Sequence, residues 1–157
     1  MAEDHKSSVL RFIQWTGVND ELPERYSFKD SYSDIVTTSL QSDRIERGRV
    51  TCTLTVEPCH LNNFGGLHGG FVAAVAERVS IACARTVVSE DRELFLGELG
   101  ISYLSSATQN AMVTVDGSII RSGRNVTTVA VDFMLGDTGK LVYTTRATFY
   151  TTPMAKL

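Results

Sequence analysis

The sequence predicts one α+β domain in which an antiparallel sheet wraps around a single long central helix. The segment 68–87 is rich in alanine and carries apolar residues at helical spacing. Four segments dense in β-branched and aromatic residues follow it, over 95–104, 111–121, 125–135 and 141–151. Short connections between consecutive strands favour antiparallel pairing, and one long helix among strands is typical of α+β order.

The part of the chain before the long helix is expected to be mixed. The segment 1–30 is predicted to hold a short amphipathic helix over 6–15, a lid or packing element, and a loop over 22–30. The segment 35–40 is rich in Val, Ile and Thr and is expected to be a first strand. Apolar and polar residues alternate over 49–57, which predicts a half-buried strand.

Length and composition limit the classes of protein to which the chain can belong. With 157 residues, 43% of them hydrophobic, it is long enough for one domain and too short for two. The 15 basic and 18 acidic residues are interspersed and give a net charge of −3, so neither nucleic acid nor a membrane surface is an expected partner. The sequence also lacks an apolar run near the ~18 residues that a membrane span needs.

Cysteines and histidines show no ligand or disulfide pattern. The cysteines, Cys52, Cys59 and Cys83, are odd in number and not closely paired, so we expect a reducing compartment. His60 is simply the sequence neighbour of Cys59, and no metal is expected. The last three residues, 155–157, read Ala-Lys-Leu and have the form of a peroxisomal address, so the peroxisome or the cytoplasm is the expected location.

A helical wheel divides the segment 68–87 into two unlike faces. A core stripe lies within about 60° of His68 and comprises Phe71, Val72, Val75, Val79, Ala82 and Cys83. The opposite face is small and apolar and comprises Gly70, Ala73, Ala74, Ile81 and Ala84, with Glu77 as its carboxylate. No basic residue lies three or four positions from Glu77. Glu77 is therefore either an exposed glutamate on an alanine-rich helix or a base approached by a ligand or a second chain.

The start of the helix also allows two interpretations. His68 is either a capping or packing histidine or a catalytic one. The Gly65-Gly66 and Gly69-Gly70 pairs suit backbone N–H groups that approach an anion at a helix N-terminus, and they suit plain turns equally well.

The run 62–70, Asn-Asn-Phe-Gly-Gly-Leu-His-Gly-Gly, followed by Glu77, resembles the signature of hotdog-fold acyl-CoA thioesterases of the phenylacetate-pathway and 4-hydroxybenzoyl-CoA thioesterase type. In that signature Asn, Gly and His-Gly-Gly precede an acid on the following helix. The likeness covers about 50–150, including Ile-Ser-Tyr-Leu at 101–104, and is less clear in the first forty residues. It implies a hotdog fold.

The resemblance implies a role for each residue of the signature. Glu77 acts as general base on water or as nucleophile on the thioester carbon. The Gly69 N–H stabilises the oxyanion, a kind of donor typically worth ~3 kcal/mol of barrier. Asn62, from the neighbouring subunit, orients the nucleophile or the carbonyl, His68 holds the loop or the thioester, and Gly70 is grouped with the substrate-binding residues. The implied assembly is a dimer or a dimer of dimers, a homotetramer.

This chain departs from the family pattern at two positions. Close relatives carry Asp where this chain has Glu77, although Glu occurs in sister groups. Some relatives carry Ser or Thr near the position of Leu96, so which hydroxyl, if any, assists Glu77 is open, with Ser102 and Ser105 as candidates.

Basic residues near two turns are candidates for binding the phosphates of coenzyme A. They are Arg121, Arg124 and Lys140, and the alternative is that they are ordinary solvated turn residues. No cofactor is implied, because coenzyme A is part of the substrate.

The function expected from the resemblance is hydrolysis of an acyl- or aroyl-CoA thioester to free CoA and a carboxylic acid. One alternative is a hotdog module that binds acyl-CoA without turnover, against which Glu77 and Asn62 speak. Another is a hydratase or dehydratase, which usually needs a catalytic His paired with an acid, whereas His68 falls within the thioesterase pattern.

Overall fold

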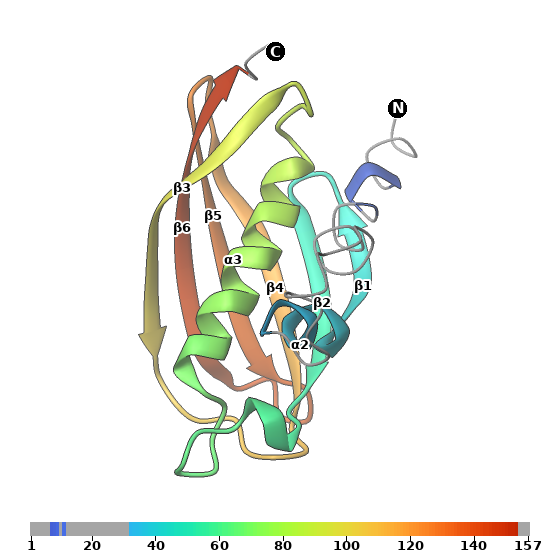
Figure 1. Ribbon diagram of the computed structural model, residues 1–157, viewed down its shortest axis with the longest axis vertical. Helices are drawn as coiled ribbons and strands as arrows, with labels where there is room; N and C mark the ends of the chain where they lie inside the picture. Colours follow the sequence, from blue (N-terminus) through green and yellow to red (C-terminus); the bar gives the residue numbers. More distant parts are fainter. Residues whose placement is uncertain (1–6, 10, 12–31, 154–157) are drawn as a thin grey trace, which may run out of the picture.

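Six antiparallel strands form one curled sheet around helix α3 in the computed structural model, which describes residues 7–9, 11 and 32–153 (Figure 1). The strand order is β1-β2-β4-β5-β6-β3, so β1 and β3 are the two edges. The elements are α2 (Tyr32–Ser39), β1 (Leu40–Glu46), β2 (Arg49–Thr55), η2 (Pro58–His60), α3 (Gly69–Arg85), β3 (Arg92–Tyr103), β4 (Met112–Ser122), β5 (Val126–Leu135) and β6 (Leu141–Pro153).

The long helix and the strands around it lie close to their predicted ranges. Helix α3, predicted over 68–87, is the longest described helix at 17 residues, and no described helix is long and apolar enough to cross a membrane. The four later strands and the strand predicted over 49–57 are present, and every pair is antiparallel. The α+β prediction is therefore confirmed.

The prediction of a strand over 35–40 is wrong, because helix α2 occupies this segment and β1 begins only at Leu40. The hydroxyls of Thr37 and Ser39 donate to the carbonyl oxygens four residues earlier, at 2.8 and 2.5 Å, which satisfies these groups within a helix. The side chain of Val36 is buried in the core. Tertiary packing thus overrides the local preference for strand.

Predictions near the termini fall mostly outside the described residues. Of the helix expected over 6–15, positions 7–9 and 11 are helical. The loop expected over 22–30 and the tripeptide at 155–157 lie outside the described residues.

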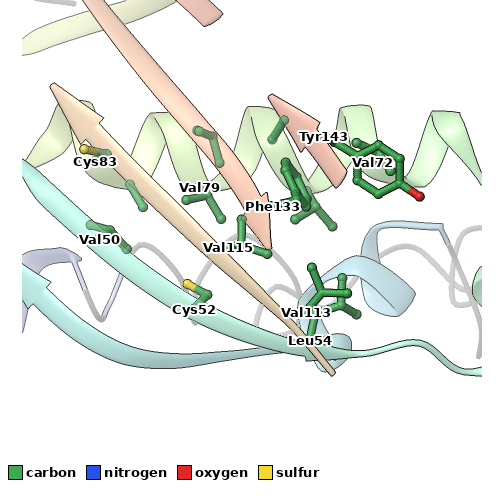
Figure 2. Close-up of a cluster of buried hydrophobic side chains, with 14 of the residues drawn as sticks. Val50, Cys52, Leu54, Val72, Val79, Cys83, Val113, Val115, Phe133 and Tyr143 are labelled. Atoms are coloured by element: carbon green, nitrogen blue, oxygen red, sulfur yellow. The ribbon is translucent and has the colours of Figure 1, made fainter. Parts of the chain in front are cut away.

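The core lies between the inner face of the sheet and the predicted stripe of α3 (Figure 2). All six residues of that stripe are buried, namely Phe71, Val72, Val75, Val79, Ala82 and Cys83. They meet inward-facing side chains of β2, β4 and β5, among them Leu54, Val115 and Phe133. This packing fixes the position of α3 on the sheet, and therefore the position of its N-terminus.

Cys52 and Cys83 are buried and Cys59 is exposed, and all three are free thiols. Burial raises the pKa of Cys52 and of Cys83 to about 12. Both thiols therefore stay protonated at neutral pH and act as small apolar core groups rather than as nucleophiles.

Gly117 of β4 faces α3 at Val79 and Cys83. A Cβ atom at this position would be 3.0 Å from Cγ1 of Val79 and 3.5 Å from Cβ of Cys83. The absence of a side chain thus permits the observed spacing between the helix and the sheet.

We expect Gly117→Val to lower the free energy of unfolding by about 1–3 kcal/mol, because the added methyl groups overpack the contact with α3. Ser118→Val, on the outer face of the same strand, is the control and should change it by less than about 0.5 kcal/mol. Urea unfolding monitored by circular dichroism measures both. Equal stability of the two variants would contradict close packing at Gly117.

Candidate active site at the start of helix α3

The loop over 62–66 is held in shape by the Asn62 side chain. Its Oδ1 atom accepts hydrogen bonds from the backbone N–H groups of Phe64 (2.9 Å) and Gly66 (3.2 Å). The backbone N–H of Asn62 donates to the Gly66 carbonyl at 2.8 Å, and Gly65 adopts φ +76, which favours glycine. Within its own chain Asn62 therefore builds the loop, and its Nδ2 amide remains as the donor for an outside group.

His68 is the N-cap of α3. Its Nδ1 atom accepts a hydrogen bond from the Gly70 backbone N–H at 2.9 Å, and its backbone is extended. The side chain is exposed, so the placement of His68 on the core stripe is wrong, because an N-cap residue departs from helical geometry and the wheel does not apply to it. The capping role is observed directly.

The Gly69 N–H is the donor at the helix start to which the His68 cap gives no partner. The N–H groups of Phe71 and Val72 donate to the His68 carbonyl at 2.9 and 3.0 Å, and that of Gly70 donates to the His68 ring. Among the described residues, none accepts a backbone hydrogen bond from Gly69 N–H. This donor lies at the positive end of the dipole of α3, where a developing negative charge is stabilised.

Tyr103, at the end of β3, covers Gly69. Its hydroxyl donates to the Gly69 carbonyl at 3.0 Å, and a Cβ atom on Gly69 would be 3.2 Å from the ring atom Cε1. The ring also packs edge-on against Tyr143, with centroids 5.8 Å apart. Sequence reasoning assigned Tyr103 no role, and the signal that would find it is an exposed aromatic residue at a strand end.

Glu77 lies on the opposite face of α3 from the core and is exposed in the single chain. Its neighbours Ala73, Ala74 and Ile81 are partly buried, so the face around the carboxylate is small and apolar, as the wheel predicts. Eight residues separate it from Gly69, which is roughly 12 Å along the helix axis. One chain therefore does not bring the Gly69 N–H and the Glu77 carboxylate to the same atom of a substrate.

The three basic candidates do not form one cluster within a chain. Because β4, β5 and β6 pair antiparallel in sequence, the turn with Arg121 and Arg124 and the turn with Lys140 lie at opposite ends of the sheet. Lys140 donates to the Ser105 hydroxyl at 2.9 Å, at the end where Tyr103 meets Gly69. Lys140 alone of the three thus lies at the same end of its chain as the start of α3.

Glu57, Cys59 and His60 form a group whose potential metal-ligating atoms lie within 4.8 Å of one another. Both ring nitrogens of His60 already have partners: Nδ1 accepts from the Glu57 backbone N–H at 3.0 Å, and Nε2 lies 2.7 Å from the Ser39 hydroxyl. A metal-bound histidine needs a free ring nitrogen, so this group does not fit a metal ion as it stands.

The fold is a hotdog fold, a long helix inside a curled antiparallel sheet. A free backbone N–H at the start of the helix and a carboxylate further along it are groups that hydrolases of this fold can use. Comparison with known proteins agrees. The model of the thioesterase superfamily matches residues 64–142, half of the chain, and the chain belongs to this family. The resemblance found in the sequence is thereby confirmed.

Curated proteins named acyl-coenzyme A thioesterase 13 are similar to the chain over about 60% of its length. Acyl-coenzyme A thioesterase 13 of Homo sapiens is 28% identical over 95 residues, which are 60% of this chain and 67% of the relative. The mouse protein of the same name is 27% identical over 94 residues, 60% of this chain and 66% of the relative.

Two crystal structures support the fold. Zebrafish thioesterase superfamily member 2 has a TM-score of 0.75 at 20% identity and covers 96% of this chain and 98% of its own. A thioesterase protein of Streptococcus pneumoniae, solved with coenzyme A, has a TM-score of 0.66 at 21% identity and covers 76% and 90%.

The contact between Tyr103 and Gly69 predicts an unusual result for Gly69→Ala. Alanine is a better helix former than glycine by up to ~1 kcal/mol, so the substitution alone should be neutral or stabilising. We expect it instead to destabilise the protein by about 1 kcal/mol, because the new methyl group overpacks against the Tyr103 ring. In the Tyr103→Leu background the same substitution should lose this penalty. Urea unfolding of the four proteins tests this, and stabilisation in both backgrounds would show that the ring yields.

Proposed function

We propose that this protein hydrolyses acyl-CoA thioesters at a site built from the start of α3 of one protomer and Glu77 of a second protomer. The observation that carries the proposal is the free Gly69 N–H beside the capped helix start, with a carboxylate two turns further along the same helix. Relatives named acyl-coenzyme A thioesterase support the substrate class.

The Gly69 N–H is the proposed oxyanion donor. When the thioester carbonyl is attacked, its oxygen gains negative charge, and a fixed backbone donor at a helix N-terminus stabilises this charge without reorganisation. The loop over 62–66 and the ring of Tyr103 hold the donor in place. Removal of a donor of this type typically raises the barrier by about 3 kcal/mol.

Glu77 supplies the other half of the chemistry. As general base it takes a proton from water, the hydroxide oxygen bonds to the thioester carbon, and the tetrahedral intermediate collapses with loss of the CoA thiolate, which is then protonated. As nucleophile its oxygen bonds to that carbon and expels the thiolate, and water then cleaves the resulting anhydride. Label in the Glu77 carboxylate after a single turnover in ¹⁸O-labelled water identifies the second route, with attack of water on the Glu77 carbon of the anhydride, because general-base catalysis labels the product acid alone.

The separation of roughly 12 Å between Gly69 and Glu77 along α3 requires a second copy of the chain. An antiparallel partner helix would place its own Glu77 opposite the start of α3. The partner would also meet the small, partly buried face formed by Ala73, Ala74 and Ile81, which permits close approach. The homo-oligomer is therefore part of the proposed site.

Strand β3 is the edge on which we expect the second copy. The other edge, β1, has only 7 residues, and a short edge strand offers few backbone groups for pairing. Strand β3 has 12 residues and exposes the aromatic side chains of Phe95 and Tyr103. A two-fold axis at this edge continues the sheet and runs the two α3 helices antiparallel.

The same two-fold axis affects the basic candidates for the CoA phosphates. It carries the partner's turn with Arg121 and Arg124 toward the end where Lys140 and Gly69 lie. Lys140 of one protomer and the partner's turn would then form one phosphate site, although the three residues lie at opposite ends of the sheet within a single chain. The Asn62 Nδ2 amide, which the loop leaves as a donor, would orient the carbonyl or the nucleophile.

We expect Glu77→Gln to lower kcat for thioester hydrolysis by at least about a hundredfold, because the amide neither accepts a proton nor attacks the carbonyl. Thiol release from a panel of fatty-acyl and aromatic CoA thioesters measures the rate. Glu46→Gln, an exposed carboxylate on β1, is the matched control and should retain wild-type kcat. Binding of CoA without turnover by the wild type would instead favour a non-catalytic acyl-CoA-binding module.

Mixed dimers test whether the site is shared. Asn62→Ala and Glu77→Gln chains are each expected to be nearly inactive as homodimers. If Asn62 and Glu77 of one site come from different protomers, each heterodimer has one intact site and one doubly altered site. Equal co-expression should then restore about a quarter of wild-type activity. Absence of recovery in isolated heterodimers would place both residues of a site on one chain.

A further inference from the structure

His60 is a buried histidine beneath the start of α3 that the proposed chemistry does not use. It lies in the short helix η2 and contacts three other parts of the chain. Its ring stacks on Phe71 in the first turn of α3, with centroids 4.3 Å apart. Its Nε2 atom lies 2.7 Å from the Ser39 hydroxyl at the end of α2, and its backbone carbonyl accepts from the His68 N–H at 2.8 Å.

The hydrogen bonds of the ring identify its protonation state. The Glu57 backbone N–H can only donate, so Nδ1, 3.0 Å away, must accept and carries no proton. The ring proton is therefore on Nε2 and is donated to the Ser39 hydroxyl, whose own proton goes to the Ile35 carbonyl. This arrangement requires a neutral imidazole, because the imidazolium has donors at both nitrogens.

The link from His60 to the candidate oxyanion donor is short. The His68 N–H is fixed by the His60 carbonyl, and the Gly69 N–H belongs to the next peptide group. The ring of His60 lies against Phe71, two residues beyond Gly69. A displacement of His60 would therefore move both sides of the peptide group that carries the donor.

We propose that His60 is a positioning residue that ties α2 to the start of α3 and holds the Gly69 N–H in its active orientation only while the imidazole is neutral. This rests on the thioesterase function proposed above. Protonation would place a proton on Nδ1 opposite the Glu57 N–H, so two donors would face each other in a buried site and the ring would have to move. Activity should then fall at acidic pH as His60 takes up a proton.

The groups around the ring favour the neutral form at neutral pH. Burial lowers the pKa of His60 below its usual 6.5, and the charge of Glu57 and a backbone hydrogen bond with Thr55 oppose this shift without reversing it. Among the described residues, the groups that face the ring are Glu57, Cys59 and the Thr55 backbone from the preceding and adjoining segment, Ser39 from α2 and Phe71 from α3. The Glu57 carboxylate is thus the facing charge.

His60→Asn is the central test. The Oδ1 atom of asparagine can accept the Glu57 N–H as Nδ1 does, but it cannot take up a proton, and the contact with Ser39 is lost. We expect kcat to fall about tenfold or more with KM within about threefold, since a small displacement of a catalytic group costs rate more than binding. Glu46→Gln, an exposed carboxylate on β1, is the control and should match the wild type.

The pH profile separates positioning from a merely structural role. In the wild type, kcat should decline as the pH falls through the lowered pKa of His60. His60→Asn should lose this part of the decline, and any acid limb that the two proteins share has another cause. An unchanged kcat and an unchanged acid limb in His60→Asn would overturn the proposal.

Stability gives a second readout of the same titration. Between about 6.5 and the lowered pKa, unfolded chains bind a proton at His60 that folded chains do not, so the wild type should lose stability as the pH falls through this range. In His60→Asn the dependence of the free energy of unfolding on pH should be smaller, because the proton that His60 binds in unfolded chains is missing. An identical slope in both proteins would show that His60 is not held neutral.

Ser39→Ala keeps the test decisive if His60→Asn fails to fold. It removes one hydroxyl and leaves the imidazole, and we expect a severalfold lower kcat with KM little changed.

The nuclear magnetic resonance signal of the Gly69 amide gives a readout that needs no activity. In the wild type it should shift with the titration of His60, and the same shift in His60→Asn or Ser39→Ala would overturn the proposal. If the wild type shows this shift but hydrolyses no thioester, the proposed function is rejected, whereas the coupling between His60 and the Gly69 amide still holds.

Discussion

The packing of α3 against the inner face of the curled sheet is the interaction on which the rest of the structure depends. The buried stripe of the helix meets inward-facing side chains of β2, β4 and β5, and Gly117 lets the helix approach β4 without an intervening side chain. Close-packed interiors tolerate little displacement, so this contact fixes the position of the helix axis on the sheet. The position of the helix N-terminus, and of the donor at its start, follows from it.

Capping gives partners to most of the N–H groups at the helix start and leaves that of Gly69 free. A helix begins with N–H groups that have no partner within the helix, and His68 satisfies that of Gly70 with its ring and those of Phe71 and Val72 with its carbonyl. The Gly69 N–H stays outside this set. Tyr103 fixes the Gly69 carbonyl and the Asn62 side chain fixes the preceding loop, so the free donor lies on a rigid segment. Such preorganisation is what stabilisation of a developing oxyanion requires.

The remaining surface of one chain is consistent with an incomplete site. Glu77 is exposed on a face of small residues, and the long edge strand β3 ends at Tyr103, beside Gly69. A second copy at this edge would cover the face, extend the sheet and bring a carboxylate to the donor. The same event that buries apolar surface would then complete the chemistry, which couples activity to assembly.

The sequence by itself determined the long helix, the later strands, the buried stripe and the family signature from Asn62 to Glu77, because these depend on periodicity and on motifs within short segments. The tertiary structure decided what depends on contacts between distant segments. Val36 is buried in the core, so the segment before β1 is helix rather than strand. The meeting of Tyr103 with Gly69, the burial of His60 against Phe71 and Ser39, and the separation of Lys140 from Arg121 all arise from chain topology. Side-chain periodicity along a segment carries no information about which segment lies against it, and that is the physical reason for the division.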